Sequence, residues 1–178
     1  MCDGPLLAAR PASMDERQAL VELIPRLRRY ARSLAGNREA ADDLVQDTLE
    51  RALNKAHLFA NGTDLRAWLF TVMHNAYVDQ VRGAYRGAPL DEDLEDVGQG
   101  LPQTEQLALR DLERAIARLP EEQRSVLLLV CMEGLSYDEV ARVLAVPVGT
   151  VMSRLSRARE RIRVLMEGGT HATLKVVK

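Results

Sequence analysis

The run LSYDEVARVLAVPVGTVMSRLSRARERIR, residues 135–163, has the features of two helices joined by a tight corner. Ser136 and Glu139 have the Ser-x-x-Glu spacing of a capping box, which predicts that a short helix begins directly after the serine. Pro147 disfavours helical backbone at the residue before it, so a corner is expected there and a second helix near Gly149. A short capped helix, a turn and a longer helix are the elements of a helix-turn-helix motif.

The second helix of this run is predicted to have an apolar side and a basic side. Its apolar positions recur with the 3.6-residue period of a buried helix face: Val151, Leu155, Ala158, Ile162 and Leu165. Its outward positions are Met152, Ser153, Ser156, Arg157, Arg159 and Arg163, with Thr150 and Arg154 at the edge. A basic helix is often only a solvated surface. Here the preceding turn and the small or polar residues at the N-terminal end favour a recognition helix that enters the major groove of DNA.

The composition favours an all-α protein. The chain has 178 residues, of which 47% are hydrophobic and only 4% aromatic, so its cores must be aliphatic. No segment shows a clear alternation of apolar and polar residues, as a half-buried strand does. Cys2 and Cys131 have no metal-binding spacing and make no disulfide framework, and Cys131 is expected to be buried in the apolar run VLLLVCM.

The charge is distributed unevenly, which predicts two domains and a linker. Residues 17–87 contain 11 basic against 8 acidic residues, a net charge of +3, and residues 107–167 contain 10 against 9, a net charge of +1. Residues 88–106 contain 6 acidic residues and no basic one, a net charge of -6, together with prolines and glycines. This composition is typical of a flexible linker. We therefore expect two small helical domains joined by an acidic linker, with an N-terminal extension at 1–16 and a C-terminal tail at 168–178.

The first domain is predicted to contain a helix over residues 38–56 with an acidic outer face. Its apolar positions are Ala41, Val45, Thr48, Leu49, Ala52, Leu53 and Ala56, and its polar positions are Asp43, Gln46, Asp47, Glu50 and Asn54. An acidic helix face is usually only solvated, and acids in the first turn also suit the helix dipole. The pattern alone leaves open whether this face binds a partner.

A second helix of this domain is predicted to run from Asp64, a good N-cap, to about Arg86. One side of it carries an aromatic residue, an amide, a carboxylate and two arginines: Trp68, Asn75, Asp79, Arg82 and Arg86. Such a file of side chains can hold a base edge and phosphates. Asp79 and Arg82 can equally form an ion pair within the helix, which contributes little to stability. Spacing alone leaves both interpretations open.

In their order and spacing, these segments resemble an extracytoplasmic-function sigma factor of bacterial RNA polymerase. The resemblance covers residues 17–167 and rests on ADDLVQDTLERAL, LRAWLFTVMHNAYVDQVR, the acidic linker and the corner PVGTVMSRLSRAR. It implies a sigma region 2 domain that docks on core polymerase and that recognises and melts the minus-ten element. It also implies a sigma region 4 helix-turn-helix domain that reads the minus-thirty-five element. The implied partners are promoter DNA, the beta-prime clamp helices and beta flap of core RNA polymerase, and an anti-sigma factor.

The resemblance also implies roles for particular residues. Contact with core polymerase falls to Asp42, Asp43, Leu44, Gln46, Asp47 and Arg51. Recognition of the minus-ten element falls to Phe59, Asn61, Asp64, Trp68, Asn75, Asp79, Arg82 and Arg86. Recognition of the minus-thirty-five element falls to Gly149, Thr150, Met152, Ser153, Arg154, Ser156 and Arg157. Met152 and Ser156 stand where some relatives have an arginine and an aromatic residue, so the promoter preference of those relatives cannot be transferred.

The rival interpretation is a helix-turn-helix regulator with a helical sensory or dimerisation domain, in which the polar stripe of the first domain would be only structural. An enzyme has little support, because His57, His74 and His171 have no ligand spacing and the chain has no phosphate-binding loop or nucleophile motif. We therefore expect no catalytic residue, metal or cofactor. No apolar stretch has the length of a membrane span, and the N-terminus lacks a signal-peptide pattern. A cytoplasmic protein without membrane insertion is expected.

Overall fold

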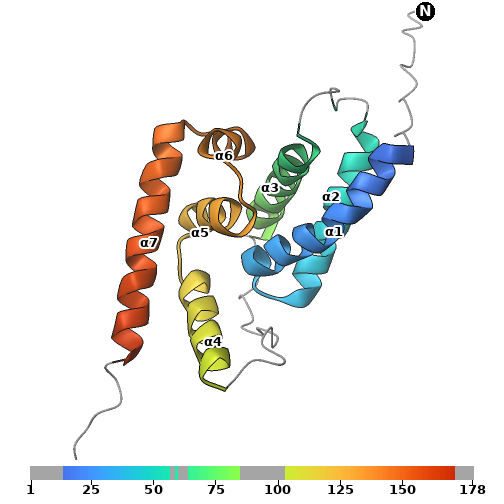
Figure 1. Ribbon diagram of the computed structural model, residues 1–178. Coiled ribbons are helices and arrows are strands. Elements are labelled where there is room, and N and C mark those ends of the chain that lie inside the picture. The colour runs from blue at the N-terminus through green and yellow to red at the C-terminus, as the bar shows by residue number, and fades with distance from the viewer. Residues whose placement is uncertain (1–13, 57–58, 60–63, 85–102, 171–178) are drawn as a thin grey trace, which may run out of the picture.

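The computed structural model describes residues 14–56, 59, 64–84 and 103–170, and these residues form helices and turns without any strand. The N-terminal half consists of α1 (Met14–Ala35), α2 (Arg38–Asn54) and α3 (Leu65–Ala84). The C-terminal half consists of α4 (Gln103–Ala117), α5 (Glu121–Leu127), the π-helical turn η2 (Leu128–Met132), α6 (Tyr137–Leu144) and α7 (Val148–Thr170) (Figure 1). The predicted all-α fold class, with two helical units, is confirmed.

The N-terminal half is a small helical bundle in which α2 packs against both α1 and α3. Gly36, with φ at +78°, ends α1, because the left-handed backbone favours glycine. The side chain of Asn37 then caps α2 by accepting a hydrogen bond from the backbone N–H of Ala40 at 2.7 Å. In the core of this bundle, the rings of Tyr30 and Phe70 meet edge to face with their centroids 5.2 Å apart.

The C-terminal half is organised around α7, which packs against α4, α5 and α6 (Figure 1). Its predicted apolar side faces inward: Val151, Leu155 and Ala158 are buried, and Ile162 and Leu165 are half-buried. The two predicted helices of residues 135–163 are confirmed, with the second beginning at Val148.

The two halves pack directly against each other. The helix α3 lies against α6, and α1 lies against α4, α5 and η2. Buried apolar residues of both halves form one continuous cluster, which runs from Leu27 and Phe70 to Val126 and Val140. The described parts of the two predicted domains therefore form one closed body.

Several helix ends differ from the domain boundaries predicted from the sequence. The helix α1 begins at Met14, inside the predicted extension 1–16, and α7 ends at Thr170, inside the predicted tail. The helix α4 begins at Gln103, inside the predicted linker 88–106, because the Gln and Glu residues there are good helix formers that continue into the apolar pattern of α4. The remainder of the linker, residues 88–102, lies outside the described residues.

The π-helical turn η2 overturns one expectation. The backbone N–H of Glu133 donates to the carbonyl oxygen of Leu128, five residues earlier, at 3.1 Å. This wider turn changes which side chains face inward, relative to an uninterrupted α-helix. As a result, Cys131 is exposed rather than buried, and Glu133 is fully buried.

Candidate nucleic-acid interface

The turn between α6 and α7 is fixed by a cap at each end of α6. The hydroxyl of Ser136 accepts a hydrogen bond from the backbone N–H of Glu139 at 3.3 Å, and the Glu139 carboxylate accepts one from the backbone N–H of Ser136 at 2.7 Å. The predicted capping box is therefore present. The hydrogen bonds from the Ser136 hydroxyl and backbone lower the pKa of the Glu139 carboxyl. At the other end, Ala145 adopts a left-handed conformation with φ at 52°.

The outward face of α7 carries most of the residues predicted to read the minus-thirty-five element. Gly149, Met152, Ser156 and Arg157 are exposed, and Thr150, Ser153 and Arg154 are half-buried. A guanidinium nitrogen of Arg157 donates a hydrogen bond to the Ser153 hydroxyl at 3.3 Å, so these two residues are adjacent on the face. Arg154 differs from the rest. Its guanidinium forms an ion pair with Glu122 of α5 at 2.7 Å, and its side chain is 20% exposed. In this structure Arg154 is therefore bound within the protein.

The acidic face of α2 carries the residues predicted to contact core polymerase, with one exception. Asp42, Asp43 and Gln46 are exposed, whereas Asp47 is half-buried. Leu44 is fully buried in the core, which corrects its assignment to this surface. Because α2 has a helical period of 3.6 residues, Leu44 points to the same side as the buried Ala41 and away from the exposed acids.

The residues predicted to recognise the minus-ten element lie along α3 and beside its N-terminus. The side chain of Asp64 caps α3 by accepting a hydrogen bond from the backbone N–H of Arg66 at 2.9 Å. The rings of Phe59 and Trp68 are in contact, with centroids 5.4 Å apart, and Asn75 is exposed further along α3. Asn61, the side chain of Arg82 and Arg86 lie outside the described residues.

Arg51 connects the acidic face of α2 to the polar stripe of α3. Its guanidinium donates to the carboxylate of Asp79 at 2.6 Å and to that of Asp47 at 2.7 Å. The hydrogen bond to Asp79, followed by that to Asp47, raises the pKa of Arg51 further above its ordinary value. From the sequence spacing, Arg82 was a possible ion-pair partner of Asp79 within the same helix. Spacing gives no information about partners on a different helix, so the pairing with Arg51 was not predicted.

The halves are tied together by a buried glutamate that the sequence analysis did not single out. The carboxylate of Glu133 accepts a hydrogen bond from Arg26 of α1 at 2.9 Å. Its backbone carbonyl accepts from Arg26 at 3.1 Å and from Arg66 of α3 at 3.2 Å. The only available sequence signal was a single acid at the end of the apolar run VLLLVCM, since a charge beside such a run often has a buried partner.

Several buried polar atoms have no hydrogen-bond partner among the described residues, and some of them face the other half of the molecule. These atoms are Tyr30 Oη, His74 Nδ1, Gln123 Oε1, Arg124 Nε, Ser125 Oγ and Glu133 Oε1. Burial raises the pKa of Tyr30, which faces Ser125 and Glu133 of the other half. Burial, together with the positive charge of Arg154 on α7, lowers the pKa of His74 on α3. An incompletely satisfied polar surface of this kind resembles a transient interface more than a permanent core.

Neither a metal centre nor a membrane span is found in the part of the chain that the structure describes. No group of three or more His, Cys, Asp and Glu side chains there is placed to hold a metal ion. None of its helices is both long enough and apolar enough to cross a membrane.

Comparison with known proteins identifies the two halves. Residues 20–74 match the family described as the Sigma2 domain of PhyR, and residues 109–162 match the family described as Sigma-70, region 4. The chain is 37% identical over 158 residues to the ECF RNA polymerase sigma factor EcfG of Rhodopseudomonas palustris, covering 88% of this chain and 87% of that protein. This chain belongs to the extracytoplasmic-function sigma factors. It is likewise 38% identical over 170 residues to the sigma factor SigM of Mycobacterium tuberculosis, covering 92% of this chain and 84% of that protein.

A solved relative gives the same assignment for this extracytoplasmic-function sigma factor. The structure of the sigma factor RpoE in complex with the anti-sigma factor NepR from Bartonella quintana matches with a TM-score of 0.78 and 33% identity, covering 87% of this chain and 98% of that chain. The protein is therefore an alternative sigma factor that directs transcription by RNA polymerase, and the rival interpretation as a helix-turn-helix regulator is not favoured. Sigma factors are initiation factors without a catalytic role, which agrees with the absence of any predicted catalytic residue.

Proposed function

We propose that this sigma factor divides promoter recognition between its two halves. Asp42, Asp43, Gln46, Asp47 and Arg51 on α2 dock on the beta-prime clamp helices of core polymerase. Phe59, Asn61, Asp64, Trp68, Asn75, Asp79, Arg82 and Arg86 recognise and help to melt the minus-ten element. Gly149, Thr150, Met152, Ser153, Ser156 and Arg157 read the minus-thirty-five element in the major groove, and Arg154 joins them only if it leaves Glu122. The two domains follow the predicted boundaries, except that each is extended to the ends of its helices. The first domain then begins with α1 at Met14, and the second runs from the start of α4 at Gln103 to the end of α7 at Thr170.

The observation that carries this proposal is the exposed face of α7, directly after a capped helix and a tight turn. In helix-turn-helix proteins the N-terminal residues of the second helix contact base edges. Here these residues include Met152, Ser156 and Arg157, all exposed. Further along the same helix, the exposed Arg159 and Arg161 complement the charge of the phosphate backbone.

The closed packing of the two halves has a consequence for this function. Elements centred about 35 and about 10 base pairs before the start site are about 25 base pairs apart, or about 85 Å along DNA at about 3.4 Å per base pair. In the closed body, α3, which carries Asn75, packs against α6, the helix directly before the recognition helix α7. The two proposed reading sites are therefore held within one closed body. We therefore expect the halves to separate before both elements are read.

Melting requires binding energy rather than covalent chemistry. A base that leaves the stack loses a few kcal/mol of stacking and pairing, and aromatic contact with hydrogen bonds to its edge offsets part of that loss. The contact between Phe59 and Trp68 and the exposed amide of Asn75 supply both kinds of group. We propose that these residues capture an unpaired base of the minus-ten element.

The partners and location follow from the same assignment. We propose core RNA polymerase, through its clamp helices and beta flap, and promoter DNA as obligatory partners. The solved relative is a sigma factor bound to an anti-sigma factor, which supports an anti-sigma partner for this chain as well. A protein with these partners works in the cytoplasm.

Run-off transcription with core polymerase tests the function directly. The sigma factor with core polymerase alone should initiate at a promoter, whereas a regulator would require a sigma factor to be present already.

Arg157→Ala should weaken binding to the minus-thirty-five duplex by about 1 to 3 kcal/mol, with the loss concentrated at one base pair if the arginine reads a guanine. A uniform loss across sequences, with a weaker salt dependence, would make Arg157 a phosphate contact instead.

The melting assignment is tested separately with Asn75→Ala. Closed-complex formation should be nearly unchanged, whereas open complex, measured by permanganate footprinting, should fall by roughly threefold to a hundredfold as one or two hydrogen bonds of about 0.5 to 1.5 kcal/mol are lost. A template already mismatched across the minus-ten element should relieve the part of the defect that comes from strand separation. Wild-type opening of duplex promoters by this variant would remove Asn75 from the base-binding site.

A further inference from the structure

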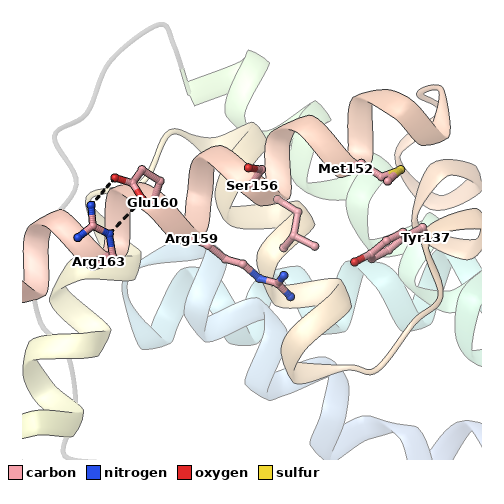
Figure 2. Close-up of a pocket in the computed structure, with 7 residues that line it drawn as sticks. Tyr137, Met152, Ser156, Arg159, Glu160 and Arg163 are labelled. Atoms are coloured by element: carbon pink, nitrogen blue, oxygen red, sulfur yellow. Dashed lines mark hydrogen bonds and ion pairs between the residues drawn. The ribbon is translucent and has the colours of Figure 1, made fainter.

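A groove of about 400 Å³ runs along the exposed side of the helix-turn-helix (Figure 2). It is lined by Tyr137 of α6 and by Met152, Leu155, Ser156, Arg159, Glu160 and Arg163 of α7. Figure 2 shows Met152 and Tyr137 together at one end of the groove and the pair of Glu160 and Arg163 at the other. Met152 is 53% exposed and Tyr137 is 37% exposed. The end of the groove nearest the turn is therefore an exposed apolar surface.

The charges along the groove differ between its two ends. Arg163 is neutralised locally, because its guanidinium pairs with Glu160 at 2.7 Å and with Glu167 at 2.9 Å. Arg157 and Arg159 have no carboxylate partner within the described part of the chain. Of these two cations, Arg159 lines the groove between the apolar end and the paired end, where it can meet a phosphate. Duplex DNA, with apolar groups on some bases and a charged backbone, complements this arrangement.

We propose that Met152, supported by Tyr137, reads the C5-methyl group of a thymine in the minus-thirty-five element. This inference rests on the proposed role of α7 as the recognition helix, and it names the chemistry that the helix reads. Among the base edges exposed in the major groove, the thymine methyl is the one apolar group. A methionine side chain has no hydrogen-bond donor for guanine or adenine N7, but its flexible thioether packs well against an apolar group.

The position of Met152 in α7 favours this contact. The helix begins at Val148, so Met152 lies in its second turn, the part that enters the major groove in helix-turn-helix proteins. Tyr137 is the first residue of α6, and its ring lines the same end of the groove. Its ring can exclude water from one side of the methionine and so increase the apolar area removed from water when the thymine methyl arrives.

The experiment uses the sigma factor bound to core polymerase and promoters randomised across the minus-thirty-five element. Selected promoters should share a thymine at one position, and replacing that thymine by deoxyuridine, which lacks only the methyl group, should weaken binding about fourfold. Met152→Ala should make thymine and deoxyuridine bind equally, and Tyr137→Ala should reduce the difference between them. Met152→Arg should select guanine at that position, because arginine reads its O6 and N7 atoms.

Val164→Ala is the matched control. Val164 is an exposed apolar residue of the same helix, 55% exposed and outside the groove lining, so this variant should retain the full preference for thymine over deoxyuridine. Circular dichroism checks that each variant keeps its helices, which is expected because Met152 and Tyr137 are both exposed.

Two results would overturn the thymine contact while leaving the proposed function intact. The first is a minus-thirty-five element that matters for binding but that contains no thymine sensitive to loss of its methyl group. The second is a Met152→Ala variant that keeps the thymine preference but loses affinity for core polymerase, which would make the groove a protein-docking surface. If no base change in the minus-thirty-five element alters binding, the assignment of α7 as a reading helix fails, and this inference fails with it.

Discussion

Ala145 shows how one residue fixes the corner before the recognition helix. It has a positive φ of 52°, a conformation that costs a residue with a Cβ atom roughly 1 to 2 kcal/mol. Its N–H donates to the carbonyl of Arg142 at 3.3 Å, and the N–H of Val146 donates to that of Ala141 at 3.0 Å. These two hydrogen bonds are those of a Schellman motif, in which glycine is the usual residue at this position. The chain therefore holds a strained alanine at the end of α6.

Ala145→Gly should stabilise the protein by about 0.5 to 1 kcal/mol. Glycine removes the strain of the left-handed backbone, and the greater conformational entropy of glycine in the unfolded chain offsets only part of that gain. Urea unfolding measures the difference. Ala141→Gly is the matched control, since the same substitution within α6 should destabilise by about 1 kcal/mol. Equal destabilisation by both changes would show that Ala145 is unstrained.

At the scale of the elements, α6 depends on charges from both halves of the molecule. The capping glutamate, Glu139, accepts hydrogen bonds from Ser136, and the positive charge of Arg66 in the other half also lowers the pKa of its carboxyl. A carboxyl whose pKa is lowered by folding stabilises the folded state at pH values above its ordinary pKa of 4.5. That contribution is lost as the pH falls through the lower pKa of the folded state.

Ser136→Ala should therefore destabilise the protein by about 1 kcal/mol at neutral pH, through loss of the cap. The difference from wild type should shrink as the pH falls below about 4.5, because the protonated Glu139 accepts the hydrogen bond from the Ser136 hydroxyl, which only wild type has, less strongly. Urea unfolding at a series of pH values measures both effects. A difference that stays constant down to pH 3 would show that the serine hydroxyl acts without the carboxylate.

The exposed acids of α2 allow a sharper test of polymerase docking than the sequence alone suggested. Asp47 is tied to Arg51, so its replacement would disturb the link to α3. Asp42→Arg with Asp43→Arg changes only exposed side chains and should abolish association with core polymerase in a pull-down, with an unchanged circular dichroism spectrum. Glu22→Arg with Asp111→Arg, an equal charge change at exposed positions on α1 and α4, away from the acidic face of α2, should bind more strongly than this variant. Retained binding by the Asp42 and Asp43 variant would remove the docking assignment.

The sequence predicted the elements well and their partners poorly, for a physical reason. A capping box and a proline act over three or four residues, so the ends of α6 and the start of α7 could be predicted from Ser136 and Pro147. The 3.6-residue period likewise predicted the buried side of α7. It could not show which helix covers a given face, so the pairing of Asp79 with Arg51 was missed and Leu44 was wrongly placed on the surface. The roles of the exposed residues stay predictions.

At the scale of the whole molecule, the surface between the halves combines an apolar part with a polar part that is incompletely paired. The apolar part is the packing of α3 against α6. The polar part centres on Glu133, which is fully buried and holds Arg26 and Arg66 of the other half, while its second carboxylate oxygen has no partner among the described residues. A buried charge contributes little net stability, yet removing its partner is costly. The arginines therefore control closure more than they control folding of either half.

Replacing both arginines, Arg26→Ala with Arg66→Ala, should shift the protein towards a state in which the halves are separated. Loss of these hydrogen bonds should destabilise the closed state by about 2 kcal/mol, a modest value because the arginines are partly exposed. The ratio of closed to open protein should therefore fall about thirtyfold. Small-angle scattering measures the change, since a compact chain of this length has a radius of gyration of about 16 Å and an open one is larger.

Arg28→Ala with Arg29→Ala is the control, because it removes the same charge from exposed positions on α1 and should leave the radius of gyration unchanged. The open variant should also bind promoter DNA more readily than wild type in the absence of core polymerase, because separation of the two reading sites no longer has to break the contacts of Glu133. If the double variant at Arg26 and Arg66 stays as compact as wild type, the apolar packing of α3 against α6 is sufficient for closure. Core polymerase would then have to disrupt that packing itself before both promoter elements could be read.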